Sequence, residues 1–503
     1  MDFWSIIQTG FATAFQPQNL LYCFIGVFIG TLIGVLPGIG PSGALAILLP
    51  TTFNIPAVSA IIMMTGIYYG AMYGGSTTSI LVNIPGEAAS VVTCIDGYKM
   101  ARQGRAGPAL GIAAFGSFIA GLAGIVFLAF LAPYVANLAM DFGPPEYFSL
   151  MILGLTLVIY LGSNSIIKAV MMAVVGIILG CVGQDPILAK PRLVYGFDAL
   201  WDGLGLPPVI MGLFGISEVL LNLERTEKVD VYKTKLKGFL PSWEDWRLSA
   251  LPIARGTVLG FMLGVLPGGG AIVASFASYA VEKKFSRHPE TFGNGAIEGV
   301  AGPESANNAA TMGGLVPLLT LGIPTNVAMA MMLAALMIHG TPPGPLLIQN
   351  HPDLFWGIVI SMVVGNMALL GLNLPLIGMW VKVLKVPYKI LFPLILLFCL
   401  IGAFSVNSLV ADIVIMLIFG CLGYLMKKYG YDAAPMMLAF VLGPMVEINL
   451  RQALMISKGK FSIFVVHHPI SLVCLLVALL FLLLPLVPSF KKKREKIILE
   501  EEP

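Results

Sequence analysis

Two short segments place proline and glycine inside long apolar runs, where they would break a membrane helix. Pro37-Gly38-Ile39-Gly40-Pro41 lies in the first half of the chain, and Pro267-Gly268-Gly269-Gly270 lies in the second. Proline removes a backbone donor and glycine tolerates non-helical torsions, so both segments leave free N–H and carbonyl groups. Free N–H groups attract carboxylates, and free carbonyls attract Na⁺. We predict substrate contacts here, with packing kinks as the alternative: Gly38, Gly40, Ser42, Gly268 and Gly270.

A second pair of breaks follows runs of hydroxyl and amide side chains. These breaks are Asn83-Ile84-Pro85-Gly86-Glu87 and Gly322-Ile323-Pro324-Thr325-Asn326. Neutral donors hold carboxylates without the desolvation cost of a buried Arg or Lys, although they also bridge helices. The substrate contacts predicted from this pair and the preceding runs are Thr77, Thr78, Asn83, Asn307, Asn308, Thr311, Thr325 and Asn326.

Acidic residues beside these breaks are candidates for holding a coupling ion. Glu87 ends the first break, and Glu304 precedes the amide-rich run of the second half. A carboxylate within a membrane binds Na⁺ or carries a proton, and backbone carbonyls at Gly86 and Gly322 would assist; a place at the membrane interface is the alternative. No cofactor and no other metal is expected, because the six cysteines are scattered and form no Cys-x-x-Cys pair.

Two enzyme motifs overlap at the first break, and each lacks its partners. Gly38 to Gly43 matches Gly-x-Gly-x-x-Gly, but no strand precedes it and no acidic residue follows before Glu87, so the nucleotide-binding fingerprint fails. Gly40 to Gly43 also matches the Gly-x-Ser-Gly of intramembrane serine proteases. Their base is a buried His, and His339 is the one candidate, at a predicted helix end. We therefore expect no enzyme.

The two halves of the chain resemble each other. Gly34 to Gly38 recurs unchanged as Gly264 to Gly268, which defines a first offset between the halves. Gly74-Gly75 and Ile84-Pro85 recur as Gly313-Gly314 and Ile323-Pro324, which share a second, larger offset. The difference between the two offsets fits a polar insert around Glu282 to Asn294. Two repeats with broken helices are typical of secondary transporters.

The positive charges give each half an orientation. No Lys or Arg precedes Lys99, whereas cations gather between residues 223 and 250 and in the tail from Lys491 to Arg494. By the positive-inside rule the first half begins outside, the second begins inside, and the C-terminus is cytoplasmic. One loop fits badly, because Arg451, Lys458 and Lys460 would face outward.

Composition requires a membrane protein. Of 503 residues, 57% are hydrophobic and 11% are charged, whereas soluble domains have about 25% charged residues. The net charge of +3 argues against nucleic-acid binding. We predict an all-α polytopic membrane protein with two inverted-topology repeats, broken helices and re-entrant hairpins. Its parts are an interfacial segment (1–18), repeats at 19–222 and 250–488, a cytoplasmic linker (223–249) and a cytoplasmic tail (489–503).

Four motifs resemble the large membrane subunit of tripartite tricarboxylate transporters, the TctA type: Gly34 to Gly40, Tyr69 to Ser76, Asn83 to Glu87 and Gly302 to Ala309. The resemblance implies a multi-pass permease of the bacterial inner membrane, and the charge pattern predicts that its N-terminus is periplasmic. It implies two partners, a periplasmic carboxylate-binding protein and a small membrane subunit of four helices. It also implies import of citrate-like di- or tricarboxylates with a cation, Na⁺ or H⁺, and without ATP.

These inferences combine into one expected mechanism. The substrate carboxylates would lie between the two pairs of broken helices near the bilayer midplane, and alternating access would move one inverted bundle past the other. A passive carboxylate or anion channel on the same repeats is the alternative.

Overall fold

The computed structural model describes residues 3–36, 40–161, 165–224, 238, 240–383 and 388–484, and in these ranges the chain is almost wholly helical. The helices of the first half are α1 (Phe3–Ala14), α2 (Pro17–Val35), α3 (Gly40–Leu48), α4 (Ala57–Val82), α5 (Val91–Arg102), α6 (Ala106–Ala139), α7 (Pro144–Leu161), α8 (Ile166–Gly180), α9 (Leu206–Ile210), the π-helical η4 (Met211–Ile216) and α10 (Ser217–Glu224). Strands β1 (Gly183–Gln184) and β2 (Pro191–Arg192) form a small antiparallel hairpin between α8 and α9.

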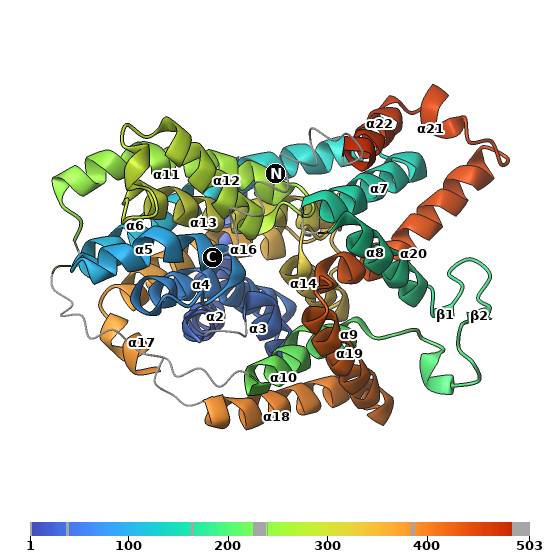
Figure 1. Ribbon diagram of the computed structural model, residues 1–503. Coiled ribbons are helices and arrows are strands. Elements are labelled where there is room, and N and C mark those ends of the chain that lie inside the picture. Colours follow the sequence, from blue (N-terminus) through green and yellow to red (C-terminus); the bar gives the residue numbers. More distant parts are fainter. Residues whose placement is uncertain are drawn as a thin grey trace. The chain divides into compact units, whose positions relative to one another are not determined.

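The second half is helical as well (Figure 1). Its helices are α11 (Trp243–Val265), α12 (Gly270–Phe285), α13 (Glu298–Leu321), α14 (Val327–Ile338), α15 (Leu347–Asn350), α16 (Pro352–Asn373), α17 (Ile377–Val383), α18 (Tyr388–Asn407), α19 (Val410–Lys428), α20 (Ala433–Ile456), α21 (Ile463–Val466) and α22 (Pro469–Leu483). Short 3-10 turns occur at Leu49–Thr52, Ala88–Ser90, Asp198–Leu200 and Pro289–Thr291.

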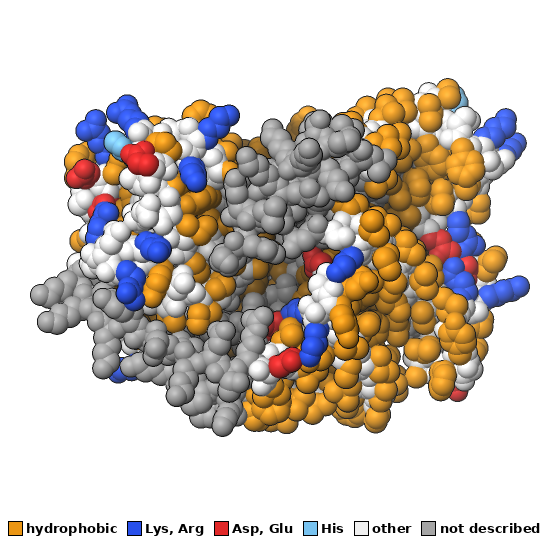
Figure 2. All heavy atoms as spheres, viewed as in Figure 1, with side chains coloured by type: hydrophobic (Ala, Val, Ile, Leu, Met, Phe, Trp, Pro, Cys, Tyr) orange, Lys and Arg blue, Asp and Glu red, His pale blue; other side chains and the backbone are white. Residues whose placement is uncertain are grey.

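The prediction of an all-α polytopic membrane protein is confirmed. Within the described residues, nine helical segments are long and apolar enough to cross a bilayer. They are Pro17–Val35, Ala57–Val82, Ala106–Ala139, Pro144–Leu161, Leu206–Glu224, Trp243–Val265, Pro352–Asn373, Val410–Lys428 and Ala433–Ile456. Figure 2 shows broad areas of hydrophobic side chains on the surface, with charged side chains in small groups. Most of the predicted linker and the whole predicted tail lie outside the described residues.

The chain forms two compact units, and each unit takes helices from both halves of the sequence. Unit 1 comprises Met1–Asn137, Leu206–Val265 and Gly270–Tyr424. Unit 2 comprises Leu138–Gly205, Leu266–Gly269 and Leu425–Pro503. The units therefore do not follow the predicted repeat ranges 19–222 and 250–488, which remain a prediction about sequence relationship.

Two helix pairs in unit 1, α2 with α4 and α11 with α13, pack backbone against backbone (Figure 1). In the first pair a methyl group added at Gly30 would lie 2.5 Å from the Ile67 carbonyl oxygen. In the second pair a methyl group at Gly260 would overlap the Ala306 carbonyl oxygen. Small residues allow this close approach, which is the usual basis of helix association in lipid.

The same contact recurs at matched positions of the two halves. Gly30 and Gly260 correspond at the first sequence offset, and their partners Ile67 and Ala306 correspond at the second. The flanking contacts correspond at the same two offsets. In the first pair Gly26 lies against Met63 and Gly34 lies against Ala71; in the second pair Gly256 lies against Gly302 and Gly264 lies against Ala310. The repeat read from the sequence thus corresponds to a repeated packing arrangement, while the inversion of one half relative to the other stays a prediction.

The helix breaks lie where the sequence predicts them. Helices α2 and α11 end at Val35 and Val265, and α3 and α12 begin at Gly40 and Gly270. Helix α4 is followed by Asn83 with φ 59°, and α13 is followed by its counterpart at the second offset, Gly322, with φ 70°. Both left-handed positions end a helix, which is the common role of this conformation.

The polar insert of the second half docks on the first half. Asp96 of α5 accepts hydrogen bonds from the backbone N–H groups of Gly293, Gly295 and Ala296 at 2.7–2.9 Å. Its other oxygen accepts from the Tyr279 hydroxyl at 2.9 Å. Because one carboxylate satisfies four donors, the insert is fixed against α5.

We expect Gly264→Ala to lower the free energy of unfolding by about 1–3 kcal/mol, because the added methyl group would overlap the Ala310 carbonyl, which the α13 helix holds in place. Gly371→Ala is the matched control, since no atom lies within 4 Å of the added carbon there. The measurement is thermal unfolding of the detergent-purified chain. Equal melting temperatures for the two variants would refute the backbone contact.

Candidate functional site

A cluster of buried polar side chains lies inside unit 1. The polar cluster consists of Ser76 on α4, Glu87 before α5, Thr93 on α5, Ser117 on α6, and Glu304, Asn307 and Asn308 on α13. None of these side chains is more than 5% exposed. Both halves of the chain contribute to it.

Glu304 is held by hydroxyl groups from the first half of the chain. Ser76 Oγ donates to Glu304 Oε2 at 2.6 Å, and Thr93 Oγ1 donates to Oε1. Asn308 Nδ2 donates to the Glu304 backbone carbonyl at 3.0 Å and to Ser117 Oγ at 2.7 Å. The Glu304 carboxylate is therefore hydrogen-bonded, but only by neutral donors.

Glu87 is held in the same manner, by neutral donors. Its Oε2 accepts from the Ala89 backbone N–H at 2.6 Å, and its Oε1 accepts from Asn307 Nδ2 at 3.2 Å. Among the described residues, no Lys, Arg or His forms an ion pair with Glu87 or Glu304. Burying a carboxylate without a basic partner is costly, so these two groups are candidates for binding a cation or a proton.

Two contacts between the halves are reciprocal. Asn307 Nδ2 donates to Glu87, and Asn326 Nδ2 donates to the Tyr68 hydroxyl at 3.1 Å. At the second offset Tyr68 corresponds to Asn307, and Glu87 corresponds to Asn326. Each half thus contacts the other with the same two positions, as in an association with two-fold symmetry.

Several predicted site residues keep a buried oxygen without a partner. These atoms are Asn307 Oδ1, Asn308 Oδ1 and Thr325 Oγ1. Buried polar atoms are nearly always hydrogen-bonded in native proteins. The predicted region therefore has unused capacity to bind a ligand through oxygen.

A small cavity opens beside the polar cluster. Its volume is about 10 Å³, enough for one water-sized particle. It is lined by Tyr73, Ser76 and Thr77 of α4, by Leu110, Ala113, Ala114 and Ser117 of α6, and by Asn373, Leu374 and Ile377.

Other predicted residues have structural partners. Thr78 Oγ1 donates to the Val35 carbonyl at the end of α2 at 2.7 Å, and Thr311 Oγ1 donates to the Asn307 carbonyl at 3.0 Å. Asn83 is exposed, and its backbone adopts the left-handed conformation. Asn326 caps α14, because its side chain accepts a hydrogen bond from the Met329 N–H at 3.0 Å.

The glycine positions differ in surroundings. Gly40 has φ +64° and open space around it, and Gly270 has φ +44° near the Asn326 amide. A Cβ added at Gly268, in unit 2, would lie 2.6 Å from the Val158 Cα atom. Ser42 is half-buried in the first turn of α3, and Gly86 and Gly322 are buried at the second breaks. Gly38 lies outside the described residues.

Sequence reasoning missed four groups that complete the site: Thr93, Ser117, Tyr73 and Asn373. Ser117 is the one serine of the long apolar helix α6, and a polar residue inside an otherwise apolar span is itself a signal of function. Asn373, at the end of α16, carried no such signal. Neither did Thr93 or Tyr73, because only folding brings them to Glu304 and the cavity.

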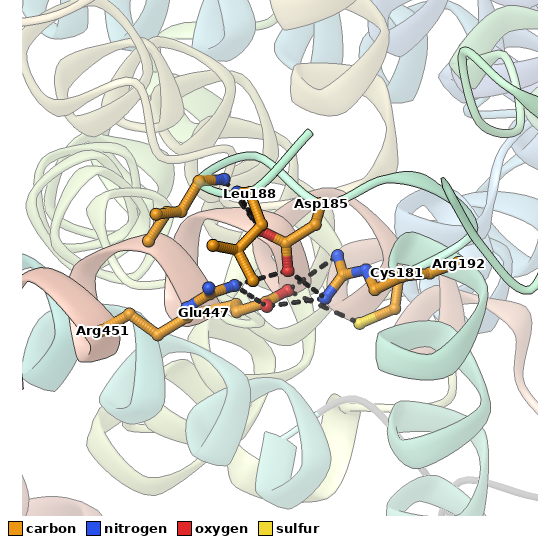
Figure 3. Close-up of polar contacts among 7 residues, drawn as sticks. Cys181, Asp185, Leu188, Arg192, Glu447 and Arg451 are labelled. Atoms are coloured by element: carbon orange, nitrogen blue, oxygen red, sulfur yellow. Dashed lines mark hydrogen bonds and ion pairs between the residues drawn. The ribbon is translucent and has the colours of Figure 1, made fainter. Parts of the chain in front are cut away.

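Unit 2 holds a separate group of charged side chains between the β-hairpin and α20 (Figure 3). Arg192 binds Glu447 through two hydrogen bonds of 2.7 and 3.1 Å, and Arg451 binds Asp185 at 2.7 Å and Glu447 at 2.9 Å. The Arg451 guanidinium and the Leu188 backbone N–H hold the pKa of the Asp185 carboxyl well below its usual value. Arg451, which the sequence analysis placed in a loop, lies on helix α20 and is neutralised by carboxylates; the orientation predicted from the charges stays a prediction.

We expect Arg451→Met to increase trypsin cleavage after Arg192, because Asp185 loses the closer of its two arginine partners. Lys458→Met is the matched control, since this side chain is exposed and outside the ion-pair group. The low pKa of Asp185 keeps the carboxylate charged, so protection in the wild type should not change between about pH 5 and pH 8. Identical cleavage rates in the two variants would contradict this role of Arg451.

Comparisons with known proteins match most of the chain. Residues 20–438 match the model of the family described as the tripartite tricarboxylate transporter TctA family. An uncharacterised 52.8 kDa protein from the TAR-I ttuC′ 3′ region of Agrobacterium vitis is 50% identical over 502 residues, covering 100% of both chains. A second uncharacterised protein, from the TAR-II ttuC′ 3′ region of the same organism, is 50% identical over 243 residues, which is 48% of this chain and 100% of its own. No solved structure matches.

Proposed function

Because the chain belongs to the tripartite tricarboxylate transporter TctA family, we propose that it is the permease subunit of a secondary transporter that imports citrate-like di- or tricarboxylates together with a cation. The family is one of transporter components and not of enzymes. Membership also makes the chain part of a three-component system. We propose the remaining details, namely substrate class, coupling, partners and orientation.

The observation that carries the coupling proposal is the pair of buried carboxylates, Glu87 and Glu304, that only neutral groups contact. A passive anion channel gains nothing from two buried negative charges, since they would repel its substrate. A symporter needs such charges, because the cation that neutralises them lowers the energy of the site before an anion binds. Symport is therefore favoured over the channel.

The substrate would be held by backbone N–H groups at the first breaks and by neutral side chains of the second half. Gly40 and Gly270 start helices after a break, where free N–H groups point outward. Asn308 already donates to Ser117 and to the Glu304 carbonyl, so it would position the site, whereas Asn307 donates one amide hydrogen to Glu87 and keeps the other for a substrate carboxylate. The expected roles differ: backbone N–H groups and free side-chain donors hold carboxylates, and carboxyl, carbonyl and amide oxygens hold the cation.

The system implied by the family supplies the other components. We propose a periplasmic carboxylate-binding protein that delivers the substrate and a small four-helix membrane subunit that accompanies the permease in the bacterial inner membrane. The charge distribution supports a periplasmic N-terminus and a cytoplasmic C-terminus.

We expect Asn308→Ala to lower binding-protein-dependent citrate uptake at least about tenfold, because the amide joins Ser117 to the Glu304 backbone. Asn449→Ala is the matched control: its amide donates to the carbonyl four residues earlier, as that of Asn308 does, but it lies on α20 of unit 2. Uptake is measured in proteoliposomes holding the complete complex, with imposed Na⁺ and proton gradients.

The gradients separate the candidate functions. Uphill uptake that stops when both gradients are removed supports symport. Uptake that is indifferent to both gradients would refute it and leave the channel. Normal uptake by Asn308→Ala would remove this residue from the proposed site.

A further inference from the structure

We propose that the small cavity between α4, α6 and the end of α16 is a binding site for one alkali cation of the size of Na⁺, with Glu304 as its counter-charge. This inference rests on the proposed function and adds to it a location for the coupling ion. The site uses Tyr73, Ser76, Thr77, Ser117 and Asn373, of which Thr77 alone was predicted from the sequence, as a substrate contact.

The size of the cavity suits a small ion. Its volume of about 10 Å³ corresponds to one water-sized particle. The polar lining consists of four hydroxyl groups and one amide, all oxygen-bearing. Hard cations prefer such oxygen ligands.

The hydrogen bonds leave these oxygens as acceptors. The Ser76 proton is used by Glu304, and the Tyr73 proton is used by Asn366 Oδ1 at 3.2 Å. The Ser76 and Tyr73 oxygens then have lone pairs but no proton left for an anion, and Ser117 Oγ already accepts from Asn308 Nδ2 at 2.7 Å. The lining is therefore matched to a positive ligand.

Asn373 provides the independent sign of a missing ligand. Its Nδ2 donates to the Leu369 carbonyl at 3.0 Å, which fixes the amide orientation and makes the other atom the oxygen. This Oδ1 is buried and has no partner, although the side chain lines the cavity and is only 4% exposed. A cation in the cavity would satisfy it.

The charge balance selects a monovalent ion. Glu304 lies one hydroxyl group away from the cavity, through Ser76, and no described cation pairs with it. One carboxylate balances one positive charge. The described residues contain no group of three or more His, Cys, Asp or Glu side chains that would hold a divalent metal.

Occupation of this cavity would also influence the substrate region. Ser117 lines the cavity and accepts from Asn308, and Asn308 binds the backbone of Glu304. A cation bound to Ser117 would therefore fix the Asn308 amide, whose free Oδ1 and neighbour Asn307 lie among the predicted substrate contacts.

The test is Na⁺-dependent thermal stabilisation of the purified, full-length chain, with choline chloride as the ionic-strength control. A ligand that binds only the folded chain raises the melting temperature with the logarithm of its concentration once that concentration exceeds Kd. We expect Na⁺ to stabilise the wild type. We expect Asn373→Leu to raise the Na⁺ concentration at which the melting temperature begins to increase by about tenfold or more, which corresponds to roughly 1.4 kcal/mol for the lost ligand oxygen. Asn449→Leu is the matched control, because its amide also donates to the carbonyl four residues earlier.

A second variant tests the site in case the first variant misfolds. If Asn373→Leu does not fold, Ser117→Ala removes a different lining oxygen with a smaller change in volume and should shift the Na⁺ dependence in the same direction. A folded variant of either kind with wild-type Na⁺ dependence would overturn the site. So would the absence of Na⁺ stabilisation in the wild type.

The readouts separate this inference from the proposed function. Uptake driven by a proton gradient alone, without Na⁺ stabilisation, refutes the Na⁺ site and leaves symport standing, with Glu304 as the proton carrier. Na⁺ stabilisation that Asn373→Leu weakens, in a chain that transports no carboxylate, supports the site and refutes the proposed function.

Discussion

The arrangement of unit 1 depends on two helix pairs, α2 with α4 and α11 with α13. In each pair, glycines of one helix lie against backbone carbonyls of the other. Lipid offers no hydrophobic force between helices, so close packing must supply the attraction. A carbonyl inside a helix cannot move aside, and this fixes the register of α2 on α4 and of α11 on α13 to a single residue. Ser76 lies on α4 of the first pair and Glu304 lies on α13 of the second, so the hydrogen bond between them joins the two pairs. The glycines thus fix each pair internally, and the polar cluster forms where the two pairs meet.

The chain neutralises its carboxylates in two different ways. Outside the apolar helices, Asp185 binds the guanidinium of Arg451, a permanent charge that cannot leave. Inside unit 1, Glu87 and Glu304 have hydroxyl, amide and backbone donors in place of arginine. These donors satisfy the lone pairs but leave the negative charge to be compensated by a particle that binds and dissociates. The first arrangement stabilises a loop, and the second suits a carrier.

The sequence predicts the breaks well because proline and glycine act on the local backbone. The ends of α2, α4, α11 and α13 all lie at the predicted motifs, and both repeat offsets recur in the packing contacts. The residues that line the cavity could not be predicted in this way. Asn373 reaches the cavity only because α16 packs against unit 1 helices far away in sequence, and nothing in its local pattern distinguishes it from an amide at a helix end. Thr78 shows a contact that the sequence did not predict, since its hydroxyl in the polar run donates to the α2 backbone; its role as a substrate contact stays a prediction.

The repeated scaffold carries chemistry that is not repeated. At the second offset, Glu304 corresponds to Thr65, Glu87 to Asn326 and Ser76 to Leu315. The helix pairs and the reciprocal contacts tolerate these replacements because they depend on backbone packing and on one polar atom per position. The carboxylates do not recur, so each half contributes one carboxylate at a position where the other half has a neutral side chain. The cation proposed for the cavity would compensate Glu304 alone, and Glu87 would need a second cation or a proton because it is buried as well.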